Sequence, residues 1–76
     1  MAPHSALVTT PSLRYWRTRR RLSQRGLADL AHVSLGRVRH LEAGGRARVL
    51  TVHQLAVALK LPPQLLTLPP PSHSEQ

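Results

Sequence analysis

The sequence predicts an all-α fold, a compact bundle of five short helices. The apolar residues are almost entirely Leu, Val and Ala, and the chain has one Tyr, one Trp and no Phe. This composition favours small, closely packed helices over strands, which prefer β-branched and aromatic residues. Apolar residues recur at intervals of three and four in several short segments, and Ser, Gly or Pro separates these segments. No segment shows the strict alternation of a half-buried strand.

The length of 76 residues allows one domain. We expect the folded domain to cover residues 11–68. Residues 1–10 are expected to be a flexible N-terminal arm, and residues 69–76 a disordered tail, because three prolines are followed there by small polar residues.

The first helix is expected over residues 12–21, with Leu13 and Trp16 one turn apart on its inward side. The second is expected within residues 22–31, where Ser23 is a good N-cap and the apolar residues have helical spacing.

Ser34 is expected to cap a third helix, about 35–43, in which Val38 and Leu41 point inward. Two glycines at 44–45 end this helix, and a basic loop follows. A fourth helix is expected over residues 52–60, capped by Thr51. A fifth is expected over residues 63–68, with Pro63 in its first turn.

The net charge is +8 and the sequence pI is about 12. A charge this high on a small domain indicates an anionic partner, most often nucleic acid. A polybasic membrane-binding peptide would need one long amphipathic helix, whereas the basic residues here are spread over several short segments. We therefore expect no membrane partner. Arginine suits phosphate and guanine contacts, but a GC-rich genome produces the same excess of Arg over Lys.

Several classes of site are excluded by composition. The chain has no Cys, which rules out disulfides and thiolate metal sites and is compatible with a cytoplasmic location. No apolar run approaches the ~18–20 residues that span a bilayer, and the N-terminus lacks the features of a signal peptide. There are no paired carboxylates and no phosphate-binding loop. We expect no enzymatic activity, no cofactor and no metal; His32 has no second ligand at suitable spacing.

Two short helices joined by three residues, the second with a basic outward face, meet the requirements of a helix-turn-helix. Ala28 is a small residue where the second helix would cross the first, and Val33 can fill the turn. The segment LSQRGLADLAHVSLGRVRHLEAG, residues 22–44, resembles the phage repressor/Cro-type (XRE) helix-turn-helix family. The residues that carry the resemblance are Ser23, Gln24, Leu27, Ala28, Val33, Ser34, Val38, Leu41, Glu42 and Gly44.

The resemblance extends over about residues 13–66 and implies a lambda-repressor-like DNA-binding domain. In this family an Arg of the first helix commonly pairs with the Glu that ends the recognition helix. Here the pair is Arg17 with Glu42, expected to be bidentate, partly buried and structural in role. The alternative is that Glu42 is a solvated carboxylate at the helix end.

The resemblance also implies two sets of DNA contacts. The first consists of residues expected to contact phosphates: Gln24, Ser34, Arg46 and Arg48. The second consists of residues on the third helix expected to read bases in the major groove: Leu35, Gly36, Arg37, Arg39 and His40. Arg39 is expected to bind guanine O6 and N7, and His40 a base or a phosphate.

The chain departs from the family pattern in three places. Leu35 and Gly36 replace polar residues at the first reading positions, so base specificity is weakened or moved to other residues. His32 occupies a turn position that is usually Gly and that needs a positive φ. Arg25 and Gly26 replace acids, which favours salt-sensitive, nonspecific DNA binding.

The predicted function is a DNA-binding transcriptional regulator, a repressor, that binds double-stranded DNA as a homodimer in the cytoplasm, at the nucleoid. The apolar residues available for the dimer contact, or for ordinary core packing, are Leu61, Leu65, Leu66 and Leu68. Two alternatives remain open. One is an antitoxin that binds a toxin or another regulatory protein. The other is a protein-interaction module that has lost base reading.

Overall fold

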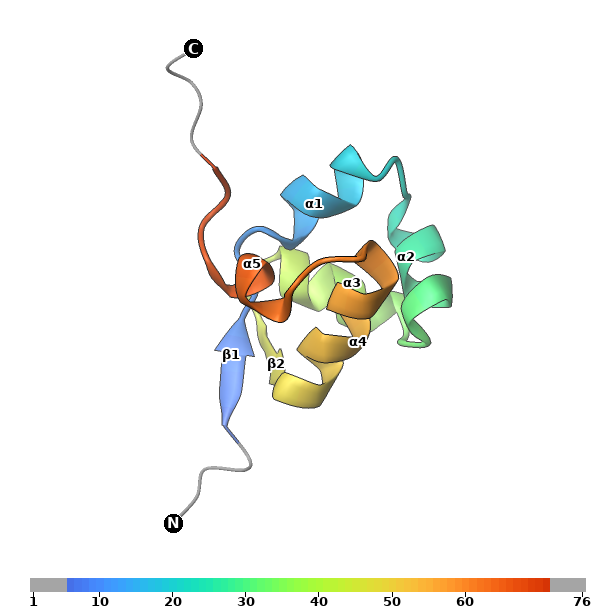
Figure 1. The fold of residues 1–76 in the computed structure, drawn as a ribbon. Helices are drawn as coiled ribbons and strands as arrows, with labels where there is room; N and C mark the ends of the chain where they lie inside the picture. The colour runs from blue at the N-terminus through green and yellow to red at the C-terminus, as the bar shows by residue number, and fades with distance from the viewer. Residues whose placement is uncertain (1–5, 72–76) are drawn as a thin grey trace.

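Five helices and two short strands make up residues 6–71, the part of the chain that this computed structural model describes (Figure 1). The elements are β1 (Leu7–Thr9), α1 (Leu13–Arg19), α2 (Gln24–Ala31), α3 (Leu35–Glu42), β2 (Arg46–Arg48), α4 (Val49–Leu59) and α5 (Pro63–Thr67). The predicted all-α bundle is confirmed, with a small antiparallel sheet added at its edge.

The core is built from Leu, Val and Ala alone, as the composition indicates. Every helix contributes to it, and α4 contributes most; the buried residues are Leu13, Leu27, Ala28, Ala31, Val38, Leu41, Ala47, Val52, Leu55, Ala56, Leu59 and Leu66. Full burial of each Leu or Val contributes roughly 1.5–3 kcal/mol. Trp16, on the inward side of α1, is only partly buried and packs against this core.

The ends of α2 and α3 follow from local sequence. The Ser23 hydroxyl accepts a hydrogen bond from the Gly26 amide at 2.8 Å, and the Ser34 hydroxyl accepts one from the Arg37 amide at 3.0 Å. Both serines therefore cap a helix by satisfying one of its unpaired amides. The C-terminus of α3 closes in a Schellman motif, in which Gly44, with φ of +102°, follows the helix.

The helix boundaries differ from expectation by up to three residues, and two of these differences have a clear cause. The fourth helix begins at Val49, three residues before the predicted start, because Arg48 leaves β2 with an extended backbone (φ −70°, ψ 153°) and leads directly into the helix. Thr51 therefore lies in the first turn and is not the cap. The first helix ends at Arg19, because Arg21 adopts a left-handed conformation with φ of 59°.

The prediction of a flexible arm over residues 1–10 is wrong for residues 7–9, which form β1. This strand pairs with β2 in the register Leu7–Arg48, Val8–Ala47 and Thr9–Arg46. A three-residue strand is too short for alternation to be recognised, and its partner lies far along the chain. Residues 1–5, and residues 72–76 of the predicted tail, lie outside the described residues; residues 69–71 are exposed and have no regular secondary structure.

Ser12 is fully buried and joins the start of α1 to α5. Its hydroxyl lies within hydrogen-bond distance of the carbonyl oxygens of Leu65 and Leu66. We expect Ser12→Ala to lower the free energy of unfolding by about 1–3 kcal/mol, because the partly buried carbonyl oxygen of Leu65 loses the hydroxyl that donates to it, whereas that of Leu66 keeps the bond from the Ser12 amide. Urea denaturation measures this loss. Thr67→Ala is the control, because it removes an exposed hydroxyl with a local bond to Gln64; equal losses in both variants would contradict the prediction.

Candidate nucleic-acid interface

The helix-turn-helix consists of α2, a three-residue turn and α3. His32 adopts a left-handed conformation with φ of 59° and ψ of 40°, so the expected positive φ at this position is confirmed. Val33 packs against the core from the turn, and Ala28, with 2% of its surface exposed, allows close approach of the two helices. The turn therefore fixes α3 against α2.

The inward side of α3 is formed by Val38 and Leu41, both essentially inaccessible to solvent. Most of the residues expected to read bases are exposed: Gly36, Arg37, Arg39 and His40. Leu35 is different, because its side chain is half-buried and packs against the core. The expectation that Leu35 reads a base is thus weakened, since part of its apolar surface already serves the fold.

His40 lies over the second of the two glycines that follow α3. A Cβ atom added to Gly45 would stand 2.1 Å from Nε2 of His40, so a side chain there would make the exposed imidazole move. Gly44 is required for a different reason, because its φ is positive. In this arrangement the imidazole lies at the C-terminal end of α3.

Arg17 and Glu42 form a bidentate ion pair between α1 and α3. Arg17 Nε donates to Glu42 Oε2 at 2.5 Å, and Nη2 donates to Oε1 at 3.0 Å. The two side chains are 11% and 6% exposed. The third guanidinium nitrogen, Nη1, donates to the carbonyl oxygen of Leu22 at 2.8 Å. Glu42 is thus held in a partly buried ion pair, in contrast to a solvated helix-end carboxylate.

Gln24, expected at a phosphate, extends this network. Its Nε2 donates to Glu42 Oε1 at 3.1 Å, so α2 is tied to the same carboxylate as α1. An amide nitrogen carries two hydrogens, and one remains for another acceptor. Ser34, also expected at a phosphate, is exposed and caps α3; its hydroxyl can still donate while it accepts from Arg37.

Arg46 and Arg48 lie in β2, where a basic loop was expected. Ala47 between them is 1% exposed, whereas both arginines are exposed. Because successive side chains of a strand point to opposite faces, the two guanidinium groups lie on the same outer face of the sheet. The pairing with β1 therefore arranges two cations that the sequence alone left in a loop.

Two arginines of the first helical region acquire roles that sequence reasoning missed. Arg20 Nε donates to the carbonyl oxygen of Leu59 at 2.7 Å, and so joins the end of α1 to the end of α4. Arg14 lines a polar hollow together with Arg39 of α3. The position of Arg14, one turn before Arg17 on the same side of α1, is the sequence signal that could have revealed it.

The comparisons with known proteins decide the family. The model of the Helix-turn-helix family matches residues 13–66. This chain belongs to the XRE-type helix-turn-helix family. No curated protein and no solved structure matches the chain. The match runs from the first core residue of α1 to the last core residue of α5, and it leaves β1 outside. The chain is therefore a DNA-binding regulator of the XRE type.

Within residues 6–71 of this XRE-type domain, no helix combines the length and apolarity that a membrane crossing requires. In the same range, no group of three or more His, Cys, Asp or Glu side chains is placed to hold a metal ion.

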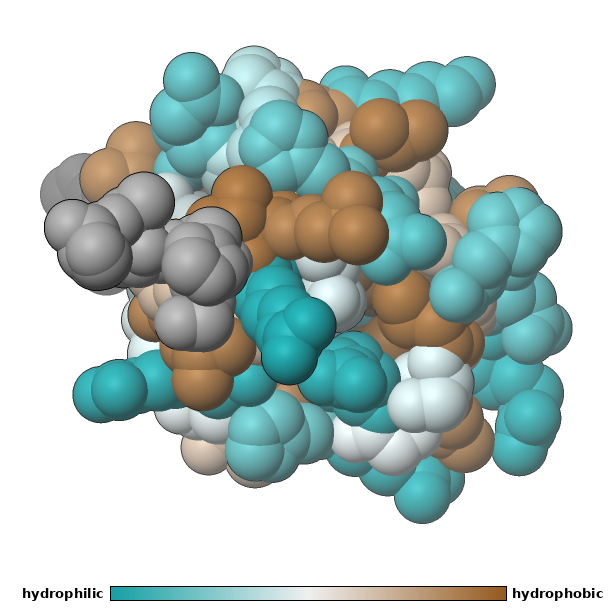
Figure 2. All heavy atoms as spheres, turned by 90° about the horizontal axis from the view of Figure 1, so that it is seen from below, coloured by the Kyte–Doolittle hydropathy of each residue, from teal (hydrophilic) through white to brown (hydrophobic). Residues whose placement is uncertain are grey.

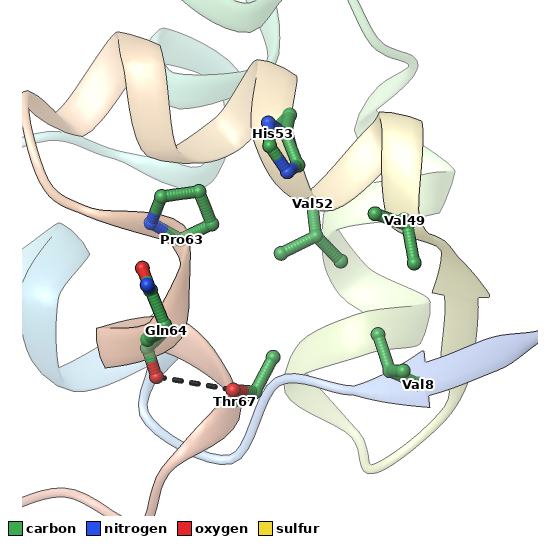
Figure 3. Close-up of a pocket in the computed structure, with 7 residues that line it drawn as sticks. All are labelled: Val8, Val49, Val52, His53, Pro63, Gln64 and Thr67. Atoms are coloured by element: carbon green, nitrogen blue, oxygen red, sulfur yellow. Dashed lines mark hydrogen bonds between the residues drawn. The ribbon is translucent and has the colours of Figure 1, made fainter.

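An apolar pocket of about 300 Å³ lies between β1, α4 and α5 (Figure 3). Its lining consists of Val8, Val49, Val52, His53, Pro63, Gln64 and Thr67. None of the residues expected to contact DNA takes part in it.

Proposed function

We propose that this protein is a transcriptional repressor that inserts α3 into the major groove of double-stranded DNA. The observation that carries the proposal is that α3 is amphipathic. Val38 and Leu41 anchor it in the core, while Arg37 and His40 are exposed on its outer face. Arg46 and Arg48, which follow α3 directly in β2, supply cations for the phosphate backbone. A helix held in the groove at an operator excludes other proteins from that site.

Binding to an inverted repeat requires two copies, with half-sites about one helical turn apart. Of the residues considered for a dimer contact or for core packing, Leu66 is fully buried and belongs to the core. Leu61 and Leu65 are half-buried, and Leu68 is 53% exposed. On the face that Figure 2 shows, apolar side chains are interspersed with polar ones and form no continuous patch.

We expect a monomer in solution that pairs on DNA, because only Leu68 of the four leucines considered is exposed, and a stable interface needs a larger apolar area than one side chain provides. Sedimentation equilibrium should give the monomer mass of 8.4 kDa for the free protein and two copies on a duplex that carries an inverted repeat. A stable dimer without DNA would contradict this expectation.

The proposed function is tested by selecting sites from a random pool of duplex DNA at about 150 mM salt, near physiological ionic strength. The wild-type protein should enrich an inverted repeat. Arg37→Ala should relax the preference at one base pair of each half-site, with a loss of about 1–3 kcal/mol there. The variant keeps the cap of α3, because Ser34 binds the backbone amide of Arg37.

Arg19→Ala is the matched control for this selection, because it removes the same charge from α1 and leaves α3 intact. It should enrich the wild-type repeat. If the wild-type protein enriches no sequence, α3 does not read bases, and the interaction module without base reading replaces the repressor.

The apolar pocket between β1, α4 and α5 favours a second candidate function, the antitoxin. Leu50, at the start of α4, is 71% exposed, and the pocket beside α4 provides a surface for an apolar segment of a partner protein. Co-expression with the product of a neighbouring gene distinguishes the two functions: a stable complex that Leu50→Lys abolishes supports the antitoxin. A repressor acting alone gives no such complex.

A further inference from the structure

A polar hollow of about 580 Å³ opens between three helices of the domain. Arg14 and Arg17 of α1 line one side, Ser23 and Gln24 line it at the start of α2, and Arg39 and Glu42 of α3 close it. The hollow has room for a phosphodiester group with ordered water. Its walls come from three helices that Glu42 joins, because this carboxylate accepts hydrogen bonds from Arg17 of α1 and Gln24 of α2.

The charge of the hollow is positive. The Glu42 carboxylate is already neutralised by Arg17 and accepts a further bond from Gln24. Arg14 and Arg39 are exposed, and within residues 6–71 neither donates a side-chain hydrogen bond. Two free guanidinium groups therefore face an open, polar space. A guanidinium group matches the geometry of phosphate oxygens and binds them through paired hydrogen bonds.

Helix geometry separates Arg39 from the centre of the exposed face of α3. With 100° between successive residues, Gly36, His40 and Ala43 share the middle of that face. Arg39 lies with Leu35 and Glu42 on the edge toward α1, which agrees with its place in the hollow. Arg37 lies on the opposite edge. Both arginines therefore flank the centre of the face, and what separates them is that Arg39 lines the hollow beside Arg14 whereas Arg37 does not.

We propose that this hollow binds one backbone phosphate of DNA between Arg14 and Arg39, and that Arg39 is a positioning residue and not a reader of guanine. The inference rests on the proposed function and changes the role of Arg39 within it. It adds Arg14, a residue of α1, to the interface. Base reading is then left to Arg37 and His40.

The test combines salt dependence with site selection, for the wild-type protein, Arg14→Ala, Arg39→Ala and Arg37→Ala. Each phosphate contact that is removed lowers the slope of log K against log salt by about 0.9. Arg14→Ala and Arg39→Ala should each show that decrease on every duplex and should select the wild-type motif. Arg37→Ala should keep the wild-type slope on random DNA and relax the motif. Thermal unfolding of each variant verifies that the fold is retained.

A second measurement locates the phosphate. Single phosphates of a bound duplex are replaced, one at a time, by neutral methylphosphonates. One replacement should weaken the wild-type protein severalfold. The same replacement should change the affinity of the double variant Arg14→Ala, Arg39→Ala by less than about twofold, because both partner charges are already absent. Arg37→Ala should respond as the wild type does.

The outcomes distinguish this inference from the proposed function. If Arg39→Ala relaxes one position of the motif and keeps the wild-type slope, Arg39 reads a base, and the inference is overturned while the repressor stands. If the wild-type protein selects no motif, but Arg14→Ala and Arg39→Ala both lower the slope on random DNA, the phosphate site is supported and the proposed repressor function is contradicted. Wild-type slopes for both hollow variants overturn the phosphate site.

Discussion

Replacing Glu42 with alanine is expected to lower the free energy of unfolding by about 3–5 kcal/mol, the usual cost of removing one partner of a buried ion pair. The physical reason is the environment of Arg17, which is only 11% exposed. Without the carboxylate, two guanidinium nitrogens lose their partner in a place that water reaches poorly. Gln24 loses its acceptor as well. At about 4–8 °C per kcal/mol for a domain of this size, the melting temperature should fall by more than about 12 °C.

Thermal unfolding followed by circular dichroism measures this effect. Asp29→Ala is the matched control: it also removes one carboxylate, but Asp29 is exposed on α2, so its change should stay within about 0.5 kcal/mol. The double variant Arg17→Met, Glu42→Leu should recover much of the stability, because it leaves no unpaired charge. An equal effect of the Glu42 and Asp29 variants would show that net charge, and not the buried pair, governs stability.

The affinity for duplex DNA is expected to fall by about 10³–10⁵-fold between about 50 and about 200 mM salt, the loss found for proteins with six to ten phosphate contacts. Four exposed cations on each copy are placed for such contacts: Arg14, Arg39, Arg46 and Arg48. Two copies on one operator double that number. Fluorescence anisotropy titrations over a range of salt concentrations measure the slope of log K against log salt.

On a single half-site, the double variant Arg46→Gln, Arg48→Gln should lower that slope by about two. The control is Arg19→Gln, Lys60→Gln, which removes the same charge from the ends of α1 and α4. This control should lower the affinity slightly and keep the slope within about 0.5 of the wild type. If both double variants changed the slope equally, DNA binding would depend on total charge. Arg46 and Arg48 of β2 would then make no specific contacts with the DNA phosphates.

Much of the helix-turn-helix was predictable because its determinants are local. A serine hydroxyl caps a helix by reaching an amide three residues later, so Ser23 and Ser34 define the starts of α2 and α3 without any distant contact. Gly44 ends α3 for a reason that is equally local. The family resemblance, which residues 22–44 carry most strongly, then assigned Arg17 to Glu42, a pairing that spacing alone does not indicate.

The remaining features depend on residues that are far apart along the chain. Residues 7–9 form a strand only because β2 offers a partner, and this pairing places Arg46 and Arg48 on one face. The carbonyl partners of Ser12 and Arg20 lie in α5 and α4. Arg39 lines the same hollow as Arg14 because α1 packs beside α3 in the folded domain.

The sequence by itself therefore determined the family, the helices and the anionic partner, because composition, caps and helical spacing act over a few residues. The tertiary structure alone decided which arginines stabilise the fold and which remain free for DNA. A guanidinium group has the same chemistry at every position of the chain, and only its surroundings decide whether a carbonyl, a carboxylate or open solvent faces it.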